Sequence, residues 1–316
     1  MKICIIGKIP PVQGGTPKET ISFAYHLAKA GHQINVVTNA LEVEPEYRIF
    51  TMDYFETCGQ EARSPFKEAN LKIHYTGIDR QHRFIPYNNP SVSKLANLAK
   101  EVIEKYNCEL IYAIYLEPYG VVASLVSSWT KIPYVVQHAG SDIGRLFHSK
   151  KLNNTYCEVF QNASAIITNK KHIAAYLEHN ISLDKIYPQP ITCSFDDSQK
   201  NVMRLDLNKY IGFLKTIEHP YLVKYFKYFL EKQIDTKIPI IGIYGKTGEM
   251  KGHFDLVKAL GDLKKNGAKF NLVGLIQGPE YNLRKLILLL KEYNFLDRTW
   301  LLPYIPHWHI GSFFKA

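Results

Sequence analysis

The sequence has 316 residues and a formal net charge of +10, from 39 basic and 29 acidic side chains. Its apolar content of 46% is ordinary for a folded protein, and no apolar run approaches the ~18–20 residues that cross a bilayer. The positive charge favours polyanionic partners such as phosphorylated ligands or acidic membranes. We expect no nucleic-acid partner, because no homeodomain, zinc-finger or RNA-binding signature is visible.

The cysteines and the first residues of the chain indicate in which cellular compartment the protein is found. The cysteines are five in number, scattered and without metal-ligand spacing, which favours reduced thiols and predicts no metal site. They are Cys4, Cys58, Cys108, Cys157 and Cys193. Met1–Gly7 has too short an apolar core for a secretory signal and predicts a first strand instead. We therefore expect a cytoplasmic protein.

The first forty residues predict a strand, a glycine-rich turn, a helix and a second strand. Lys2–Gly7 is apolar enough for a buried strand, and Gln33–Thr38 is the next one. Gly14 and Gly15 lie in the turn before the helix, where they could either present the helix or let the backbone approach a ligand. This order predicts a βαβ unit.

The helix between these strands carries the best local signal in the sequence. Thr16 is predicted as its N-cap, with Pro17 at the first helical position and Glu19 closing a capping box. Apolar residues then repeat at helical spacing until Gly31, which ends the helix.

Residues 41–89 are polar, aromatic and rich in proline, and they predict loops around one strand, Leu71–Tyr75. We expect this segment to form part of an acceptor pocket. Strand–helix alternation then continues to residue 188. The predicted elements are Ser93–Tyr106, Tyr119–Trp129, Leu152–Asn162 and His172–Glu178 as helices, and Leu110–Tyr115, Tyr134–Gln137, Ala165–Thr168 and Ile186–Pro188 as strands. His138 and Asp142 follow the strand Tyr134–Gln137, at a carboxyl end where open α/β sheets bind ligands.

Residues 196–237 break this alternation and predict a linker. Within it, Tyr221–Leu230 repeats apolar residues at helical spacing, with Lys224, Lys227 and Lys232 off that stripe. A basic amphipathic helix of this kind can lie on a membrane surface. We favour the alternative, in which the helix packs between domains.

Residues 238–316 return to strand–helix alternation. The strand Ile238–Tyr244 runs into a loop with three glycines, Lys246 and Lys251, and a helix starts at His253 or Phe254. Cations at a helix N-terminus favour a phosphate, although lysines in a polar loop are often simply solvated. The remaining predicted elements are the strands Phe270–Leu275 and Thr299–Pro303 and the helix Leu283–Tyr293. Three strands are fewer than a doubly wound domain usually has.

Four segments in this order resemble the GT-B glycosyltransferases of family 4. They are the glycine-rich first turn, His138-Ala139-Gly140-Ser141-Asp142, the loop from Gly245 to Gly252, and Val273–Pro279. The resemblance covers most of the chain outside residues 41–89 and 198–237. It implies an α/β fold with two Rossmann-like, doubly wound domains facing a cleft. These would be an acceptor-side domain, 1–195, and a nucleotide-sugar domain, 238–316, that is incomplete.

On the donor side, the resemblance implies retaining transfer of a sugar from a nucleotide diphosphate sugar, with no cofactor and no metal. Lys246 and Lys251 would stabilise the leaving diphosphate. Gly278 and Tyr304 follow the second and third strands of this domain, where the family meets the nucleotide. Tyr304 could stack on the base or simply pack at the rim.

On the acceptor side, the resemblance places Gly14 and Gly15 close to the phosphates or the acceptor. His138 would hold the transferred sugar near the reacting centre, or else cap its strand. Asp142 would orient the acceptor, or else cap the following helix. The histidine–glycine–aspartate spacing of the family is one residue longer here, because Ala139 is extra.

One family feature is missing from this sequence. Family members carry two glutamates eight positions apart in the second domain, whereas Glu249, Glu280 and Glu292 have no such partner. We therefore expect a truncated glycosyltransferase that is weak or inactive alone, with a second polypeptide as one way to complete it. The alternative is a non-catalytic binding or assembly subunit. A nicotinamide oxidoreductase is disfavoured, because Gly7–Pro11 is not a Gly-x-Gly-x-x-Gly turn.

The resemblance also suggests where the protein works. Cell-surface polysaccharide biosynthesis is typical of the family, with a glycan or a lipid-linked acceptor. The basic charge suits a peripheral contact with the inner face of the plasma membrane.

Overall fold

The computed structural model describes residues 1–51, 53–54, 67–77, 89–138, 140, 142–168, 173–189 and 203–316. Contacts within the chain divide it into two compact units. The N-terminal unit comprises Met1–Val43 and Phe66–Thr192, and the C-terminal unit comprises Glu44–Pro65 and Cys193–Ala316. This division differs from the expected boundaries, because residues 44–65 and the expected linker 196–237 both go with the C-terminal unit.

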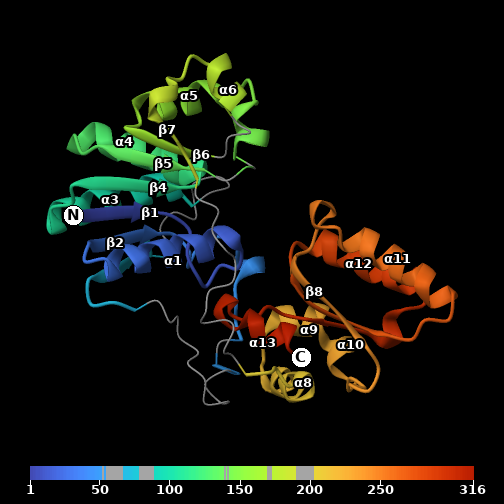
Figure 1. The fold of residues 1–316 in the computed structure, drawn as a ribbon. Coiled ribbons are helices and arrows are strands. Elements are labelled where there is room, and N and C mark those ends of the chain that lie inside the picture. Colours follow the sequence, from blue (N-terminus) through green and yellow to red (C-terminus); the bar gives the residue numbers. More distant parts are fainter. Residues whose placement is uncertain are drawn as a thin grey trace. The chain divides into compact units, whose positions relative to one another are not determined.

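The N-terminal unit is built on seven strands in the order β3-β2-β1-β4-β5-β6-β7, all parallel (Figure 1). The strands are β1 (Lys2–Ile6), β2 (Gln33–Thr38), β3 (Leu71–Tyr75), β4 (Leu110–Ile114), β5 (Tyr134–Gln137), β6 (Ala165–Thr168) and β7 (Ile186–Pro188). The helices are α1 (Gly15–Lys29), α3 (Ser91–Tyr106), α4 (Val121–Thr130), α5 (Asn153–Asn162) and α6 (Ile173–Glu178). The predicted strands are confirmed.

Burial explains why these strands could be predicted. Cys4, Ile5 and Ile6 of β1 are completely buried, as expected for a central strand of a parallel sheet covered on both faces. Ile5 pairs with Val36 of β2 on one side and with Tyr112 of β4 on the other. The strand order reverses between β1 and β4, and the carboxyl ends at such a reversal are where open α/β sheets bind ligands.

The predicted capping box at the start of α1 is wrong. The helix begins at Gly15 with Gly14 as its N-cap, and no side chain caps it. Thr16 lies inside the first turn, where its carbonyl accepts a hydrogen bond from Thr20 Oγ1 at 2.9 Å. Glu19 instead accepts hydrogen bonds from the amides of Gln137 (2.6 Å) and Gln189 (2.8 Å). Contacts distant in sequence therefore outcompete the local motif.

The C-terminal unit has three parallel strands in the order β10-β9-β8. The strands are β8 (Ile240–Lys246), β9 (Asn271–Gln277) and β10 (Thr299–Leu302). The helices are α8 (Leu207–Thr216), α9 (Pro220–Tyr225), α10 (Lys227–Leu230), α11 (His253–Lys265), α12 (Glu280–Glu292) and α13 (Ile310–Phe314). The predicted α/β class and three strands are confirmed. Among the described helices of both units, none has the length and apolar character needed to cross a bilayer.

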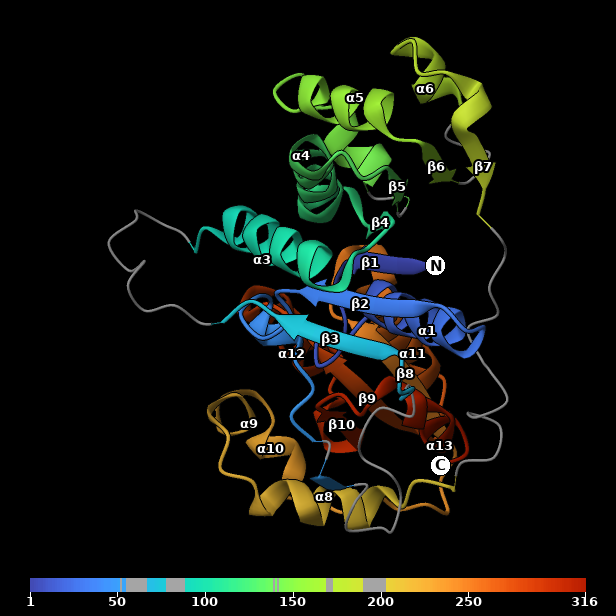
Figure 2. The same ribbon diagram turned by 90° about the vertical axis from the view of Figure 1, so that its left-hand side faces the viewer.

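The basic helix expected over Tyr221–Leu230 is two short helices, α9 and α10, which lie beside α8 in the C-terminal unit (Figure 2). Leu222, Phe226 and Phe229 are buried in the same apolar core as the strands of this unit. The predicted apolar stripe is therefore a packing surface, but it packs on the core of the C-terminal unit itself.

Two helical glycines give a matched test of packing in this unit. A Cβ at Gly261 of α11 would lie 1.9 Å from Cδ1 of Tyr293, whereas a Cβ at Gly212 of α8 would meet nothing within 4 Å. Gly261→Ala should destabilise the unit by about 1–3 kcal/mol through overpacking. Gly212→Ala should stabilise it by about 0.5–1 kcal/mol, because alanine favours helix. Urea denaturation measures both, and equal effects would argue against the close approach of α11 and α12.

Candidate functional site

Four of the predicted site residues lie at the carboxyl edge of the C-terminal sheet or in the loop that follows it. Lys246 is the last residue of β8, Gly278 follows β9, and Tyr304 lies two residues beyond β10. The strands are parallel, so these positions share the carboxyl edge of the sheet, where α/β folds bind ligands. Lys251 lies in the loop that connects β8 to α11. The four residues that were predicted from the sequence therefore belong to one edge of the sheet.

The loop after β8 leads into an uncapped helix. Gly245 (φ 137°) and Gly252 (φ 71°) both have backbone conformations that other residues rarely adopt. Gly252 is the N-cap of α11, a 13-residue helix, and within the described residues no side-chain cap hydrogen bond is made at this helix start. The ammonium-bearing side chain of Lys251 is exposed just before them. Such a helix start favours an anion.

His253 adds a buried nitrogen to this helix start. It is the first residue of α11, and only 4% of its surface is exposed. Its Nδ1 has no hydrogen-bond partner among the described residues. Burial lowers the pKa of His253, and a hydrogen bond with the backbone of Gly248 opposes this shift. An anion bound beside this ring would favour its protonated form.

Gln277, the last residue of β9, organises the same edge and was not predicted. Its Nε2 donates to the carbonyls of Glu46 (3.4 Å) and Arg48 (3.2 Å). Its Oε1 accepts from the backbone N–H of Tyr304 at 2.8 Å, and its carbonyl accepts from the backbone N–H of Thr247 at 2.9 Å. Through its side-chain amide and its backbone carbonyl, Gln277 at the end of β9 therefore links residues 46–48 with the segments that follow β8 and β10.

Tyr304 is inside this network. Its side chain is completely buried, and its hydroxyl donates to the carbonyl of Gln277 at 3.1 Å. Burial raises the pKa of Tyr304 well above its usual value. A fully buried ring has no face available to a base, so the geometry favours packing over the stacking considered for this residue.

Gly278 is buried against the neighbouring loop. A Cβ there would lie 3.3 Å from Thr247 Cβ, so glycine lets the loops after β8 and β9 pack closely. Its N–H donates to the hydroxyl of Tyr221 at 3.1 Å, and its carbonyl accepts from the same hydroxyl at 2.9 Å. The backbone groups expected to meet a nucleotide are thus engaged by a side chain of α9.

Residues 44–51, which we call the strap, lie along this edge. Glu44 Oε2 is 3.1 Å from Lys246 Nζ, and Nζ lies 3.9 Å from the centre of the Tyr47 ring. Thr51 Oγ1 donates to the carbonyl of Tyr304 at 2.6 Å. These residues belong to the C-terminal unit, and their expected part in an acceptor pocket stays a prediction. No local pattern marks a loop whose anchoring hydrogen bonds come from residues distant in sequence.

The remaining predicted residues lie in the N-terminal unit. Gly14, with φ 147°, has a backbone that favours glycine, whereas Gly15 is exposed and a Cβ there would meet nothing within 4 Å. Of the pair, only Gly14 is therefore required for the turn. Gly14 is the N-cap of α1 and Gly15 its first residue, and both follow the carboxyl end of β1.

His138 follows β5 but is only 3% exposed. Its Nε2 shares a hydrogen bond with the hydroxyl of Tyr176. Its ring lies 6.0 Å from that of Phe160, and Phe160 in turn packs on Phe147 at 5.5 Å. These contacts favour the structural alternative for His138 over a contact with a transferred sugar.

Asp142 is completely buried, and its Oδ2 accepts a hydrogen bond from the backbone N–H of Leu116 at 2.9 Å. Leu116 begins the helical turn after β4. Asp142 also begins the next helical turn, and its expected role as a cap or in orienting the acceptor stays a prediction. Its carboxylate holds a turn that precedes it by 26 residues in the chain.

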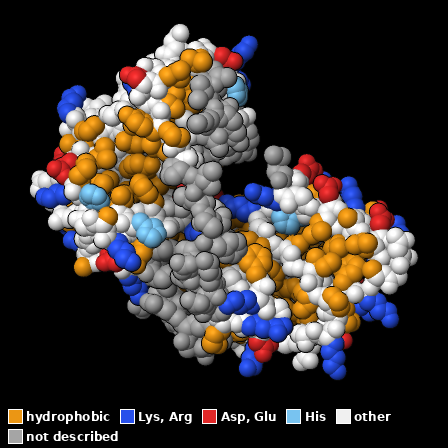
Figure 3. All heavy atoms as spheres, viewed as in Figure 1, with side chains coloured by type: hydrophobic (Ala, Val, Ile, Leu, Met, Phe, Trp, Pro, Cys, Tyr) orange, Lys and Arg blue, Asp and Glu red, His pale blue; other side chains and the backbone are white. Residues whose placement is uncertain are grey.

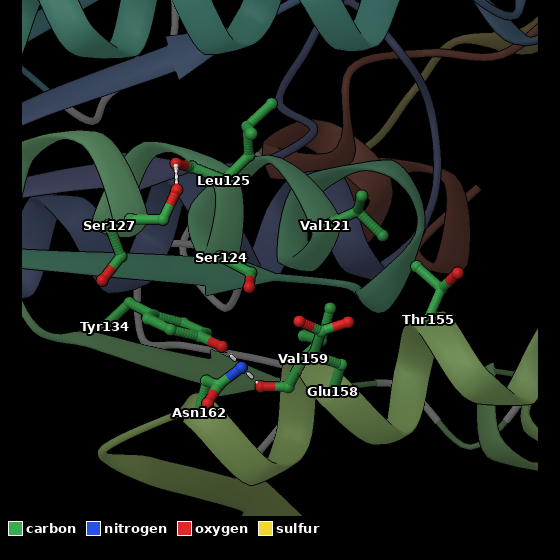
Figure 4. Close-up of a pocket in the computed structure, with 10 residues that line it drawn as sticks. Val121, Ser124, Leu125, Ser127, Tyr134, Thr155, Glu158, Val159 and Asn162 are labelled. Carbon is green, nitrogen blue, oxygen red and sulfur yellow. Dashed lines mark hydrogen bonds between the residues drawn. The ribbon is translucent and has the colours of Figure 1, made fainter.

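A pocket of about 470 Å³ lies elsewhere in the N-terminal unit, between α4 and α5 (Figure 4). Hydroxyl groups from Ser124, Ser127 and Thr155 and the carboxylate of Glu158 line it. None of the predicted site residues is among its lining. Within the described ranges, no group of three or more His, Cys, Asp or Glu side chains is placed to hold a metal ion.

The two parallel sheets and their order define the class of fold: an α/β fold of the GT-B type, with a small second unit. The chain resembles sucrose-phosphate synthase from Thermosynechococcus elongatus, with a TM-score of 0.58 and 17% identity over 99% of this chain and 73% of that one. It also resembles Anabaena HepE in complex with UDP-glucose, with a TM-score of 0.60 and 15% identity over 99% and 71% of the two chains.

A third solved structure of this fold is UDP-GlcNAc 2-epimerase from Neisseria meningitidis bound to UDP-GlcNAc, with a TM-score of 0.53 and 14% identity over 100% and 76% of the two chains. No model of a protein family matches the sequence, and a search of curated proteins finds no match. At these identities the likeness shows the fold alone, which glycosyltransferases and UDP-GlcNAc 2-epimerases share.

Proposed function

We propose that the C-terminal unit binds the diphosphate of a nucleotide sugar at the carboxyl edge of its sheet. The observation that carries this proposal is the connection from β8 to α11: Lys246 ends β8, Lys251 lies in the loop, and Gly252 is the N-cap of α11. The unpartnered Nδ1 of buried His253 at the same helix start supports it. Two solved proteins of the same fold hold UDP-glucose and UDP-GlcNAc.

The reaction we propose is transfer of the sugar, with retention, to a glycan or a lipid-linked acceptor. Departure of a nucleoside diphosphate leaves negative charge on the phosphate oxygens, and preorganised cations and helix N–H groups stabilise that charge. Lys246, Lys251 and α11 would supply this stabilisation. The proposal includes three further points. The glycan belongs to a cell-surface polysaccharide, the reaction takes place in the cytoplasm, and it needs no metal or cofactor.

A basic and apolar surface supports a peripheral membrane contact. Hydrophobic side chains gather on one face of the C-terminal unit, with lysines and arginines around them (Figure 3). Val223 and Tyr228 of α9 and α10 are more than half exposed. A groove of about 490 Å³ beside them is also lined by Lys227 and Lys291. Such a surface suits anionic lipid headgroups.

A second candidate is a binding or assembly subunit without catalysis. The burial of His138 and Asp142, and their hydrogen bonds to protein groups, favour this candidate. In the first candidate, by contrast, a second polypeptide would complete the C-terminal domain and supply the sugar-holding groups. Incubation with UDP-glucose or UDP-GlcNAc separates the two, because a transferase releases UDP when acceptor is added and a binding subunit does not.

Lys251→Ala tests the proposed diphosphate site. Loss of one charged hydrogen-bond donor should weaken UDP binding by at least ~1 kcal/mol, about fivefold, in isothermal titration calorimetry. Lys258→Ala is the matched control, because Lys258 lies on the same helix in an exposed ion pair with Asp255. Affinity that is equal in Lys251→Ala and in the unmodified protein would remove Lys251 from the site. Absence of UDP binding would remove the proposed function.

A further inference from the structure

The strap places a carboxylate on one of the two lysines of the proposed diphosphate site. Glu44 Oε2 lies 3.1 Å from Lys246 Nζ, and both side chains are about two-thirds buried, with 29% and 33% exposed. The Tyr47 ring, 3.9 Å from the same nitrogen, covers another side of the ammonium. The strap therefore provides a carboxylate and an aromatic face to the cation.

The strap is anchored independently of this ion pair. Gln277 donates to two strap carbonyls, and Thr51 donates to the carbonyl of Tyr304. Ile49 and Thr51 are buried, with 6% and 0% exposed. Because these contacts hold the strap in place, the Glu44 side chain can leave Lys246 without detaching the segment.

The backbone of Glu44 is also unusual. Its φ of 48° and ψ of 53° are left-handed, a conformation that glycine and asparagine adopt more readily than glutamate. Local strain of this kind persists only where surrounding contacts enforce it, and it is common at ligand clamps and switch segments. The left-handed backbone and the ion pair with Lys246 are thus two independent observations that single out Glu44.

We propose that Glu44 is an internal competitor for the anion that binds Lys246, so that a nucleoside diphosphate binds by displacing the Glu44 carboxylate. This inference rests on the proposed function. Carboxylate and phosphate oxygens accept the same charge-assisted hydrogen bonds from an ammonium. Two such anions repel each other when they share one cation. A ligand must therefore bring several negative charges, with contacts also to α11, to take the place of Glu44.

This arrangement predicts a preference for ligands by charge. UDP, with two phosphates, can offset the loss of the Glu44–Lys246 pair, whereas UMP gains less and uridine gains nothing from Lys246. Glu44 would thus act as a specificity-determining residue that selects diphosphates over singly phosphorylated and neutral nucleosides.

The test compares the full chain with Glu44→Gln, titrated with UDP and with uridine in a calorimeter. Glutamine keeps the size of the side chain and removes its charge. UDP should bind Glu44→Gln about fivefold to tenfold more tightly, because one like charge beside Lys246 is gone. Uridine affinity should not change. Glu46→Gln is the matched control, because it removes the same charge two residues along the strap, and it should shift UDP affinity less than twofold.

Each other outcome overturns the inference in a recognisable way. If UDP binds the unmodified chain and Glu44→Gln equally, Glu44 does not compete and the proposed function still holds. If Glu46→Gln tightens UDP binding as much as Glu44→Gln, the effect comes from the net charge of the strap and not from the position of Glu44, and the inference fails. If no variant binds UDP, both the inference and the proposed function fail.

Discussion

Replacing Phe226 by alanine is expected to destabilise the C-terminal unit by about 3–5 kcal/mol. Phe226 lies at the break between α9 and α10 and is completely buried. Its ring packs 5.6 Å from that of Tyr221 and belongs to the same apolar core as the strands of this unit. Truncation leaves a cavity that the surrounding side chains can fill only in part.

Fluorescence during urea unfolding measures this effect, because Trp300 and Trp308 are buried in the C-terminal unit. Val223→Ala is the control, since Val223 lies on α9 but is 62% exposed, and a surface change of this kind costs within ~0.5 kcal/mol. If residues 196–237 behave as a linker outside the core, both variants will unfold at nearly the same urea concentration as the unmodified protein.

The strands could be predicted from sequence because parallel strands carry their own signal. A strand buried on both faces needs a run of apolar residues, and β1 and β9 show such runs. The helices followed from apolar periodicity in the same way. Boundaries were less certain: β9 runs from Asn271 to Gln277, whereas the prediction ended it at Leu275.

The strap and the Gln277 network could not be predicted for a physical reason. A glutamine at the end of a strand looks like any polar strand end, and its role comes from carbonyls more than 200 residues away in sequence. Likewise, Phe50 and Tyr54 belong to a segment that was predicted as a polar, aromatic loop. In the structure, however, Phe50 stacks on His219 and Tyr54 packs edge-on against Tyr210. Local patterns do not specify which distant surface a loop covers.

The same difference between local patterns and contacts distant in sequence applies to the predicted site residues. Lys246 and Lys251 could be proposed from the sequence because glycine, lysine and a following helix are a local pattern with a direct physical meaning. His138 and Asp142 were placed after the correct strand, but their environments depend on Tyr176 and Leu116 from other elements. Position along a strand could be predicted, and side-chain partners could not.

Replacing Asp142 by alanine should destabilise the N-terminal unit by about 1.5–3 kcal/mol, the range for a hydrogen bond to a charged group. The substitution removes the acceptor for the backbone N–H of Leu116, and Leu116 is itself completely buried. A buried donor without an acceptor bears its full desolvation cost. Hydrogen exchange of the Leu116 amide should rise in step with the loss of stability.

Two further variants separate this structural role from a role in catalysis. Asp142→Asn keeps an oxygen acceptor for Leu116, so it should retain much of the stability that alanine loses. Asp184→Ala removes an exposed aspartate of the same unit and should change stability by less than ~0.5 kcal/mol. Should Asp142→Asn abolish sugar transfer while leaving Leu116 exchange unchanged, the carboxylate acts on a substrate, and its contact with Leu116 serves to hold it ready.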